Sequence, residues 1–360
     1  MLVKKKLNKN ESLVYLKKIN KFLVLSQENL NIIEAYLSKS KADFKHFLIT
    51  NYPSNKKNLY NEIQSLFKKD RKEKILEKSE FKKPEKIFFF NFKIKNKSYS
   101  IEFNNRKIIS SIIGQLKHLE ENSNKNSEKI IVYSYKDYSV LKLNGKMTKY
   151  RHTESHVLTG KVISHIISKF HDIKYSNWTG FLHGTTIAKN HNAALIVGNS
   201  GSGKTISSTI LVKNSFDLIC DDISPLSQEG KIGFYPNALS IKKSGFKKVD
   251  QILDDGFYDF RTVGPKGPTR YLYPKENNIH KDLVPCDLII KINYDCKFKI
   301  SVSKLHQKDI LPHFLEDSFI NKKNNSAESF MNWVLNCRCY NINYSKDNDL
   351  IGAVENLLNA

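Results

Sequence analysis

The stretch "ALIVGNSGSGKTISS", residues 194–208, decides the fold. Its glycines, lysine and threonine follow an apolar run at the spacing of a phosphate-binding loop, GxxxxGK followed by Ser or Thr. Glycine lets such a loop curl with its N–H groups pointing inward, and the positive end of the following helix completes an anion site. We therefore expect a nucleotide to be held by Gly198, Asn199, Ser200, Gly201, Ser202, Gly203, Lys204 and Thr205. Lys204 is expected to reach the β- and γ-phosphates of ATP, and the Thr205 hydroxyl to ligate Mg²⁺.

Two adjacent carboxylates, Asp221 and Asp222, end the next apolar run, "FDLIC", and Asp221 lies sixteen residues after Thr205. An acidic residue at the end of a strand beside a phosphate loop commonly holds Mg²⁺. Side chains of neighbouring residues on a strand diverge, so one carboxylate can face the metal while the other takes the proton of an attacking hydroxyl. A simpler interpretation is that Asp222 only begins the turn "DISP", where Asp is a favoured residue.

A histidine precedes the loop, because His183 in "FLHGT" lies fifteen residues before Gly198 on a predicted strand. If this strand neighbours the loop strand, His183 comes near the phosphates. A histidine in a strand is more often a packing or surface residue, so the pattern alone leaves its role open.

Three motifs together, His183-Gly184, the loop 198–205 and Asp221-Asp222, resemble the C-terminal kinase domain of the HPr kinase/phosphorylase family. That family has the same motifs in the same order, and the resemblance spans roughly residues 179–226. It implies a P-loop kinase fold of the type shared with phosphoenolpyruvate carboxykinases, and transfer of phosphate from ATP, with Mg²⁺, to a serine hydroxyl. It also implies that Asp221 is the base, that Asp222 lies near the metal and that His183 lies near the transferring phosphate.

One position departs from the family pattern. Family members usually carry Glu directly after the loop Ser or Thr, where this chain has Ile206. The chain therefore looks like a divergent HPr-kinase-like serine kinase, whose acceptor is a protein, a peptide or a small hydroxyl compound.

Strands and helices alternate from about residue 179 onward, which favours an α/β layer fold. Upstream, "KIFFFNFKIKNKSYSIEF" predicts a β-hairpin over 86–103, and apolar spacing predicts helices over 11–38 and 154–170. A Lys-rich helix is expected over 56–83. We predict a basic, mostly helical segment 1–85, a small α+β domain 86–178 and the P-loop domain 179–360.

The basic excess lies in the half without the loop. The formal net charge is +23, with 37 Lys and Arg against 17 Asp and Glu in residues 1–180, but 22 against 19 in residues 181–360. Such an excess attracts nucleic acid, anionic membranes or acidic partners. Only six of the 59 basic residues are Arg, and the abundance of Lys, Asn and Ile also fits an A/T-rich genome. Five cysteines without a CxxC pair, and no long apolar run, favour a cytoplasmic protein without a membrane span.

A second basic segment, "FRTVGPKGPTRYLYP" at 260–274, carries Arg261, Lys266 and Arg270 between Gly-Pro pairs. A mobile basic loop here could close over the triphosphate and stabilise charge in the transition state. The alternative is a surface connection whose Gly and Pro only set turns.

Three functions are compatible with these patterns. The first is a kinase for a hydroxyl of a protein, peptide or small molecule, and the second is a nucleotide-dependent switch or binding module without phosphotransfer. The third is a nucleic-acid-associated P-loop enzyme such as a polynucleotide kinase, for which the aromatic and basic run "FFFNFKIK" could stack bases. The family resemblance also implies a homo-oligomer.

Overall fold

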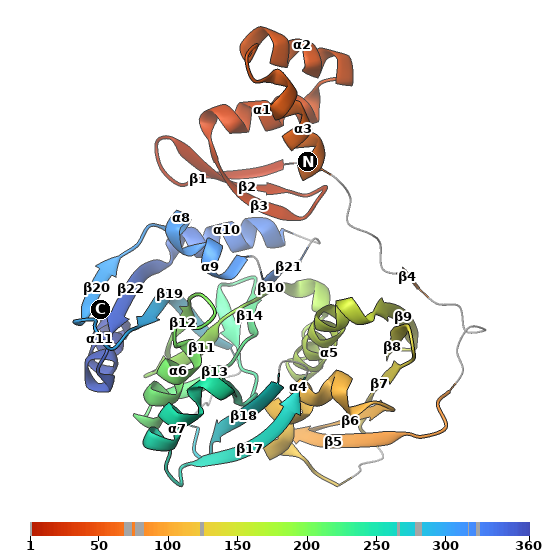
Figure 1. Ribbon diagram of the computed structural model, residues 1–360, viewed down its shortest axis with the longest axis vertical. Helices are drawn as coiled ribbons and strands as arrows, with labels where there is room; N and C mark the ends of the chain where they lie inside the picture. Colours follow the sequence, from red (N-terminus) through yellow and green to blue (C-terminus); the bar gives the residue numbers. More distant parts are fainter. Residues whose placement is uncertain are drawn as a thin grey trace.

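The computed structural model shows a mixed α/β protein with several sheets (Figure 1). It describes residues 2–67, 74–75, 83–122, 126–264, 267–277, 283–315, 317–321 and 325–360.

The central sheet carries the loop 198–205, which we call the phosphate loop after its sequence motif. Its strands, in spatial order, are β13 (Asp217–Cys220), β11 (Thr185–Lys189), β12 (Asn192–Val197), β19 (Leu283–Tyr294), β22 (Arg338–Tyr344) and β20 (Ser301–Lys304). β12 pairs in parallel with β19 and β19 with β22, whereas β11 is antiparallel to both β12 and β13. Consequently β13, β12, β19 and β22 all end at one edge of the sheet. Ligands of α/β sheets bind at such carboxyl edges.

A helical layer covers one face of this sheet. It contains α6 (Lys204–Lys213), which follows β12, together with α7 (Phe246–Ile252) and α11 (Asp347–Asn359). The apolar run of α6 buries Ile210, Leu211 and Val212 against the sheet. A small antiparallel sheet of β16 (Leu239–Lys242), β18 (Gly267–Pro274) and β17 (Phe257–Gly264) completes the same core.

A second set of strands extends the central sheet through the first residues of β19. These strands are β15 (Lys231–Gly233), β14 (Ser224–Ser227), β10 (Trp178–Leu182) and β21 (Phe319–Ile320). The helices α8 (Gln307–Ile310), α9 (Pro312–Leu315) and α10 (Ser326–Asn336) belong to this part of the chain, and α10 packs on β10.

Residues 86–178 form the predicted hairpin and supply five strands of a six-stranded sheet, whose remaining strand lies at 74–75. The strands are β4 (Lys74–Ile75), β9 (Lys146–Arg151), β8 (Tyr138–Leu143), β7 (Glu128–Ser134), β6 (Lys97–Phe103) and β5 (Phe88–Ile94). The helices are α4 (Arg106–Leu116) and α5 (Ser155–Phe170), so the helix expected over 154–170 is confirmed. Gly114 of α4 lies so close to Tyr271 of β18 that a Cβ there would be 2.2 Å from the Tyr271 ring. This close packing places α4 directly against β18, in the small sheet of the C-terminal half.

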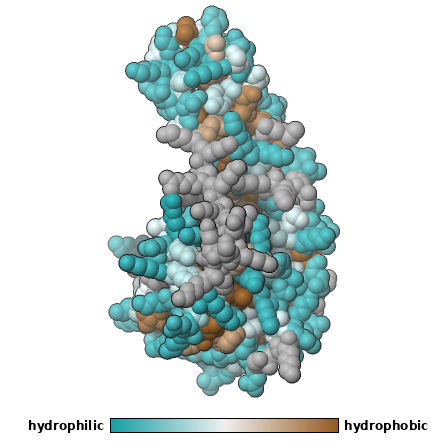
Figure 2. Space-filling view, turned by 90° about the vertical axis from the view of Figure 1, so that its right-hand side faces the viewer, coloured by the Kyte–Doolittle hydropathy of each residue, from teal (hydrophilic) through white to brown (hydrophobic). Residues whose placement is uncertain are grey.

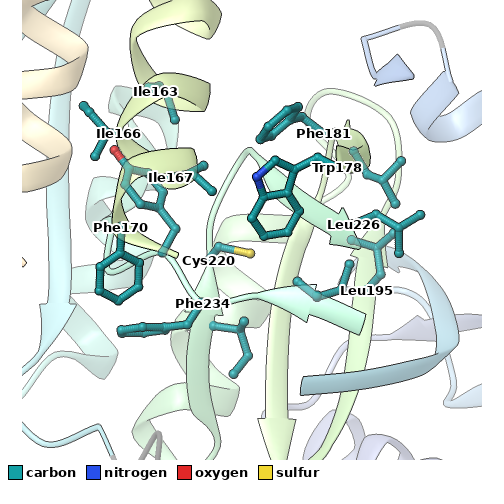
Figure 3. Close-up of a cluster of buried hydrophobic side chains, with 14 of the residues drawn as sticks. Ile163, Ile166, Ile167, Phe170, Trp178, Phe181, Leu195, Cys220, Leu226 and Phe234 are labelled. Carbon is teal, nitrogen blue, oxygen red and sulfur yellow. The ribbon is translucent and has the colours of Figure 1, made fainter. Parts of the chain in front are cut away.

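One hydrophobic core runs across the predicted boundary at residue 178. Figure 3 shows side chains of α5, such as Ile167 and Phe170, gathered near Trp178, Phe181 and Phe234. Trp178 is fully buried in this cluster. The same core contains residues from both sides of the predicted limit at 178. The domain limits at 85 and 178 therefore stay predictions.

The N-terminal unit differs from its prediction. It consists of β1 (Leu2–Lys6), β2 (Glu11–Leu16), β3 (Lys21–Ser26), α1 (Gln27–Ser38), α2 (Lys41–Asn51) and α3 (Lys56–Leu66). The helix predicted over 11–38 is wrong before Gln27, because residues 11–26 form two antiparallel strands. β2 is buried on both faces: Leu13 and Tyr15 join the main core, whereas Val14 and Leu16 join the core under α1 to α3. Such a strand shows a continuous apolar run, which also matches helical spacing.

The helix predicted over 56–83 ends at Leu66, and residues 68–73 and 76–82 lie outside the described residues. In Figure 1 the N-terminal unit lies above α8 and α10. Lys308 of α8 forms an ion pair with Glu11 of β2 at 3.0 Å, and Phe22 contacts Phe330 of α10.

Hydrophilic residues dominate the coloured surface of the face shown in Figure 2, on the N-terminal unit and on the body below it. Across the part of the chain that the structure describes, no helix has the length and apolar character needed to span a membrane.

Candidate functional site

The loop between β12 and α6 adopts the conformation that its glycines permit. Gly198, Gly201 and Gly203 have φ angles of 151°, 89° and 91°, all in the region that residues with a Cβ rarely adopt. A Cβ on Gly198 would lie 2.7 Å from Ser202 Oγ and 3.0 Å from the carbonyl oxygen of Ile292. Both the backbone conformation and the lack of room for a Cβ therefore require glycine at position 198.

Polar groups converge on this loop. The Lys204 ammonium donates to the carbonyl oxygens of Gly198, at 2.5 Å, and Asn199, at 3.2 Å. α6 begins at Lys204 with no side-chain cap on its first turn, and Ser202 Oγ is buried with no hydrogen-bond partner among the described residues. A helix N-terminus without a cap, an unpaired buried hydroxyl and a lysine across the loop are the features that fit a bound phosphate chain.

A basic rim surrounds the loop, defined by Lys204, Lys242, Lys291 and His313. Lys242 Nζ lies 3.2 Å from Ser200 Oγ, and His313 Nδ1 lies 2.9 Å from Asn199 Oδ1. Burial lowers the pKa of His313, and the charges of Lys291 and Lys204 lower it further. This rim favours a polyanion, and the sequence motif did not identify Lys242, Lys291 or His313 because they come from segments remote from the loop.

Asp221 is held rigidly at the end of β13. Its side chain is 1% exposed, and its two oxygens accept hydrogen bonds from Thr185 Oγ1 at 2.5 Å and from the Ser240 backbone N–H at 2.9 Å. The Asn237 side chain bonds both the N–H and the carbonyl oxygen of Asp221. Burial, followed by the neighbouring Asp222 charge, raises the pKa of Asp221 to about 7. Thr185, Asn237 and Ser240 are the residues that position it.

Asp222 differs from Asp221 in both exposure and conformation. It is exposed and has a φ of 61°, the left-handed conformation that Asp tolerates better than most residues. Burial lowers the pKa of Lys204, whereas the charges of Asp222 and then Asp221 act in the opposite direction. The structure therefore brings the aspartate pair and the loop lysine together, with Asp222 as the carboxylate that faces solvent.

The candidate metal ligands are few. Thr205 lies in the first turn of α6, and Asp222 lies just after the end of β13, at the same edge of the sheet. Within the described ranges, no three His, Cys, Asp or Glu side chains gather as a metal site of their own. A Mg²⁺ ion bound to a P-loop takes most of its ligands from phosphate oxygens and water, with a hydroxyl and a carboxylate from the protein, so Thr205 and Asp222 suit that role.

His183 lies in the turn between β10 and β11, at the edge where the loop and Asp221 lie. Its backbone N–H donates to Ser318 Oγ at 2.8 Å. Gly184 follows, where a Cβ would be 2.8 Å from the carbonyl oxygen of Ile196 on the loop strand. The strand order β13, β11, β12 thus places the turn of His183 between the two motifs that it accompanies in sequence.

The mobile basic loop predicted over 260–274 is wrong, because these residues lie mostly in the paired strands β17 and β18. Arg270 is 3% exposed and is bound to Asp259 and Asp250, so it stabilises the fold. Arg261 is exposed, 4.0 Å from Asp250 and over the Phe246 ring, and among the described residues no ion pair or hydrogen bond joins it to the loop 198–205. Lys266 lies outside the described residues.

Comparisons with known proteins add little to this geometry. No protein-family model matches the chain, and no curated protein matches it. Among solved structures, the chain is similar to the Hpr(Ser) kinase/phosphatase from Coxiella burnetii, at 15% identity and a TM-score of 0.25. The match covers 50% of this chain and 93% of that chain. At this level of similarity we draw no functional conclusion from it.

Proposed function

We propose that this protein is an ATP- and Mg²⁺-dependent phosphotransferase of the HPr-kinase-like type, which transfers the γ-phosphate to a hydroxyl of a protein, a peptide or a small molecule. The observation that carries the proposal is that Lys204, Asp221 and Asp222 lie at the same carboxyl edge of one sheet, where the two aspartate charges act on the pKa of Lys204. A nucleotide holder needs only the loop. A phosphotransferase also needs a carboxylate beside the terminal phosphate, to bind the metal or to accept the proton of the attacking hydroxyl.

Each residue then has a defined task. The N–H groups of 198–205 and the Lys204 ammonium bind the phosphates, and Thr205 with Asp222 holds Mg²⁺, which neutralises charge on the transferring group. Phosphoryl transfer depends mostly on positioning and charge neutralisation, so these residues supply most of what the reaction needs. We assign a contact with the transferring phosphate to His183, which lies in the turn before β11.

The two carboxylates have different tasks in this proposal. A pKa near 7 suits a general base, as the family resemblance implies for Asp221, but both of its oxygens already accept hydrogen bonds and the side chain is buried. We assign the contact with metal and acceptor to the exposed Asp222. Asp221 is then a positioning residue, whose charge acts on Lys204 and Asp222 at close range.

The proposal is tested by labelling. The purified protein is incubated with γ-labelled ATP, Mg²⁺ and a lysate of its own host, and labelled species are identified by mass spectrometry. We expect one or a few phosphorylated products that are absent with Lys204→Ala. Release of inorganic phosphate without any labelled product would contradict transfer to a hydroxyl.

A second function, a nucleotide-dependent switch, is favoured by one specific observation. Two residues of the α8–α9 segment contact different parts of the chain: Lys308 pairs with Glu11 of the N-terminal sheet, and His313 bonds Asn199 of the loop. A switch would use this connection to couple loop occupancy to partner binding. It predicts partner binding that depends on ATP and is lost in Lys204→Ala, with no phosphorylated product.

A further inference from the structure

The position of the nucleoside follows from the strand order, if the proposed function holds. β11 and β13, which carry the Asp221-Asp222 end, lie on one side of the loop strand β12, and β19 and β22 lie on the other. A triphosphate is a linear chain with the nucleoside at one end and the γ-phosphate at the other. If the γ-phosphate lies beside Asp222, the nucleoside therefore lies on the side of the loop away from Asp222. It therefore leaves toward the ends of β19 and β22.

Tyr294, the last residue of β19, lies at that position. Its backbone N–H donates to the carbonyl oxygen of Ser202 at 3.1 Å, and a Cβ on Gly203 would be 3.0 Å from Tyr294 Cβ. The side chain of Tyr294 thus begins directly beside Gly203, the residue that precedes α6. It is nonetheless 42% exposed, so part of its surface is open to a ligand.

The ring of Tyr294 is supported from behind. It makes an edge contact with Tyr344, with ring centroids 5.4 Å apart and planes at 61°. The Tyr344 hydroxyl is buried and bonds Ser207 Oγ of α6 at 2.6 Å. An aromatic ring whose neighbours are fixed loses little conformational freedom when a ligand stacks on it.

A second aromatic ring lies in the turn that follows. Phe298 is 39% exposed, its N–H donates to the carbonyl oxygen of Asp295, and its own carbonyl oxygen accepts from Ser345 Oγ. Four of the large hydrophobic side chains that are exposed in the described part of the chain fall within 294–302: Tyr294, Phe298, Ile300 and Val302. Scattered exposed apolar residues need no explanation, but a group of them that begins at a residue in contact with the loop does.

We infer that Tyr294, with Phe298 in the turn that follows β19, stacks the planar base of the nucleoside triphosphate held by the loop 198–205. The phosphoryl donor of the proposed reaction is then a nucleotide and not an inorganic polyphosphate. Stacking uses the face of the base and no specific hydrogen bond, so adenine and guanine nucleotides bind with similar affinity through this contact.

Calorimetric titration with two ligands tests this inference. Mg-ATP and Mg-tripolyphosphate are titrated into wild type, Tyr294→Ala, Tyr294→Phe and Phe298→Ala. The removal of one stacked ring is expected to weaken ATP binding about tenfold in Tyr294→Ala, while tripolyphosphate binding is unchanged. Tyr294→Phe keeps the ring and should keep wild-type affinity for both ligands. Phe89→Ala, which removes an exposed ring of β5 in the other sheet, is the matched control and should change neither.

The outcomes separate the two proposals. Equal affinity of the wild type for ATP and tripolyphosphate, or ATP affinity unchanged in both Tyr294→Ala and Phe298→Ala, overturns the base-stacking inference and leaves the proposed function standing. Equal losses for both ligands in Tyr294→Ala also overturn it, because the ring would then only support the loop. If the wild type binds neither ligand, the proposed function fails, and the inference fails with it.

Discussion

Replacing Thr185 by valine removes one hydrogen bond to the buried Asp221 and leaves the shape of the side chain nearly unchanged. Thr185 is 2% exposed, and its hydroxyl donates to Asp221 Oδ1 at 2.5 Å. A hydrogen bond to a charged group contributes about 1.5–3 kcal/mol, whereas one between neutral groups contributes about 0.5–1.5 kcal/mol. We therefore expect Thr185→Val to lower the free energy of unfolding by about 2 kcal/mol when Asp221 is ionised.

The loss of stability in Thr185→Val should depend on pH, and the raised pKa of Asp221 determines the direction of that dependence. Because the folded-state pKa is raised to about 7, the carboxyl is mostly protonated at pH 5 and mostly ionised at pH 8.5. At pH 5 the variant loses a neutral hydrogen bond, and at pH 8.5 it loses a charge-assisted one. The destabilisation should therefore grow by about 1 kcal/mol between pH 5 and pH 8.5.

Thr186→Val is the matched control. Thr186 is the next residue of β11, is fully buried, and shares its hydrogen bond at 2.8 Å with the neutral hydroxyl of Ser224. Urea unfolding of wild type and both variants at the two pH values measures the effect. Thr186→Val should cost about 1 kcal/mol at both pH values. An equal loss for Thr185→Val at pH 5 and pH 8.5 would refute the assignment of an ionisable, buried Asp221.

Three further predictions follow from single contacts. Gly198→Ala should weaken Mg-ATP binding about tenfold or more in calorimetry and should also lower the melting temperature, because its Cβ would meet Ser202 Oγ at 2.7 Å and its backbone has a positive φ. Wild-type affinity would contradict the loop geometry. Arg270→Met should lower the free energy of unfolding by roughly 2 kcal/mol while ATP affinity stays the same, since the ion pairs of Arg270 with Asp259 and Asp250 lie outside the loop. Loss of ATP binding without loss of stability would instead indicate a role for Arg270 in the site. His118 stacks on Tyr273 with ring centroids 3.8 Å apart, and burial lowers the pKa of His118 to about 4. The contribution of His118 to stability is therefore present above its unfolded-state pKa and is lost as the pH falls from about 6.5 toward 4. His118→Phe should reduce that acid-side loss in thermal unfolding between pH 7 and pH 5, and an unchanged slope would show that His118 is not the group responsible.

The phosphate loop was predictable because its signal is local. Gly198, Lys204 and Thr205 lie within eight consecutive residues, and the strand before them and the helix after them follow from their apolar spacing. The approach of Asp221 and Asp222 was predictable for a related reason, since strands that run in the same direction end at the same edge. Each of these predictions needed only the order of neighbouring elements.

The environment of Asp221 could not be predicted from the sequence. Its partners Thr185 and Ser240 lie 36 and 19 residues away, and they meet it only through the pairing of β11 with β13 and the chain leading into β16. Our proposal that Asp222 contacts both metal and acceptor, and that Asp221 positions it, follows from this burial. No spacing in the sequence shows which of two adjacent carboxylates faces solvent.

The two wrong predictions have physical causes of their own. Residues 11–16 form a strand buried on both faces, so their continuous apolar run matches a helix as well as a strand. Residues 260–274 contain Gly and Pro, which favour loops, but Arg270 is neutralised by Asp259 and Asp250 and can be buried within a sheet. In both cases tertiary packing overrode the local signal.

The central claim is that Asp221 and Asp222 make the phosphate loop a site of phosphate transfer. The rate of this transfer by Asp222→Asn tests the claim most directly. Once the labelled acceptor is identified, single-turnover transfer from γ-labelled ATP is measured for wild type, Asp222→Asn and Asp221→Asn at saturating nucleotide. The account predicts a loss of about 10²–10⁴-fold for Asp222→Asn, the size expected when a group that acts on the proton is removed. It predicts a smaller loss for Asp221→Asn, which keeps one acceptor for the Ser240 N–H. Transfer by Asp222→Asn at the wild-type rate would contradict the claim.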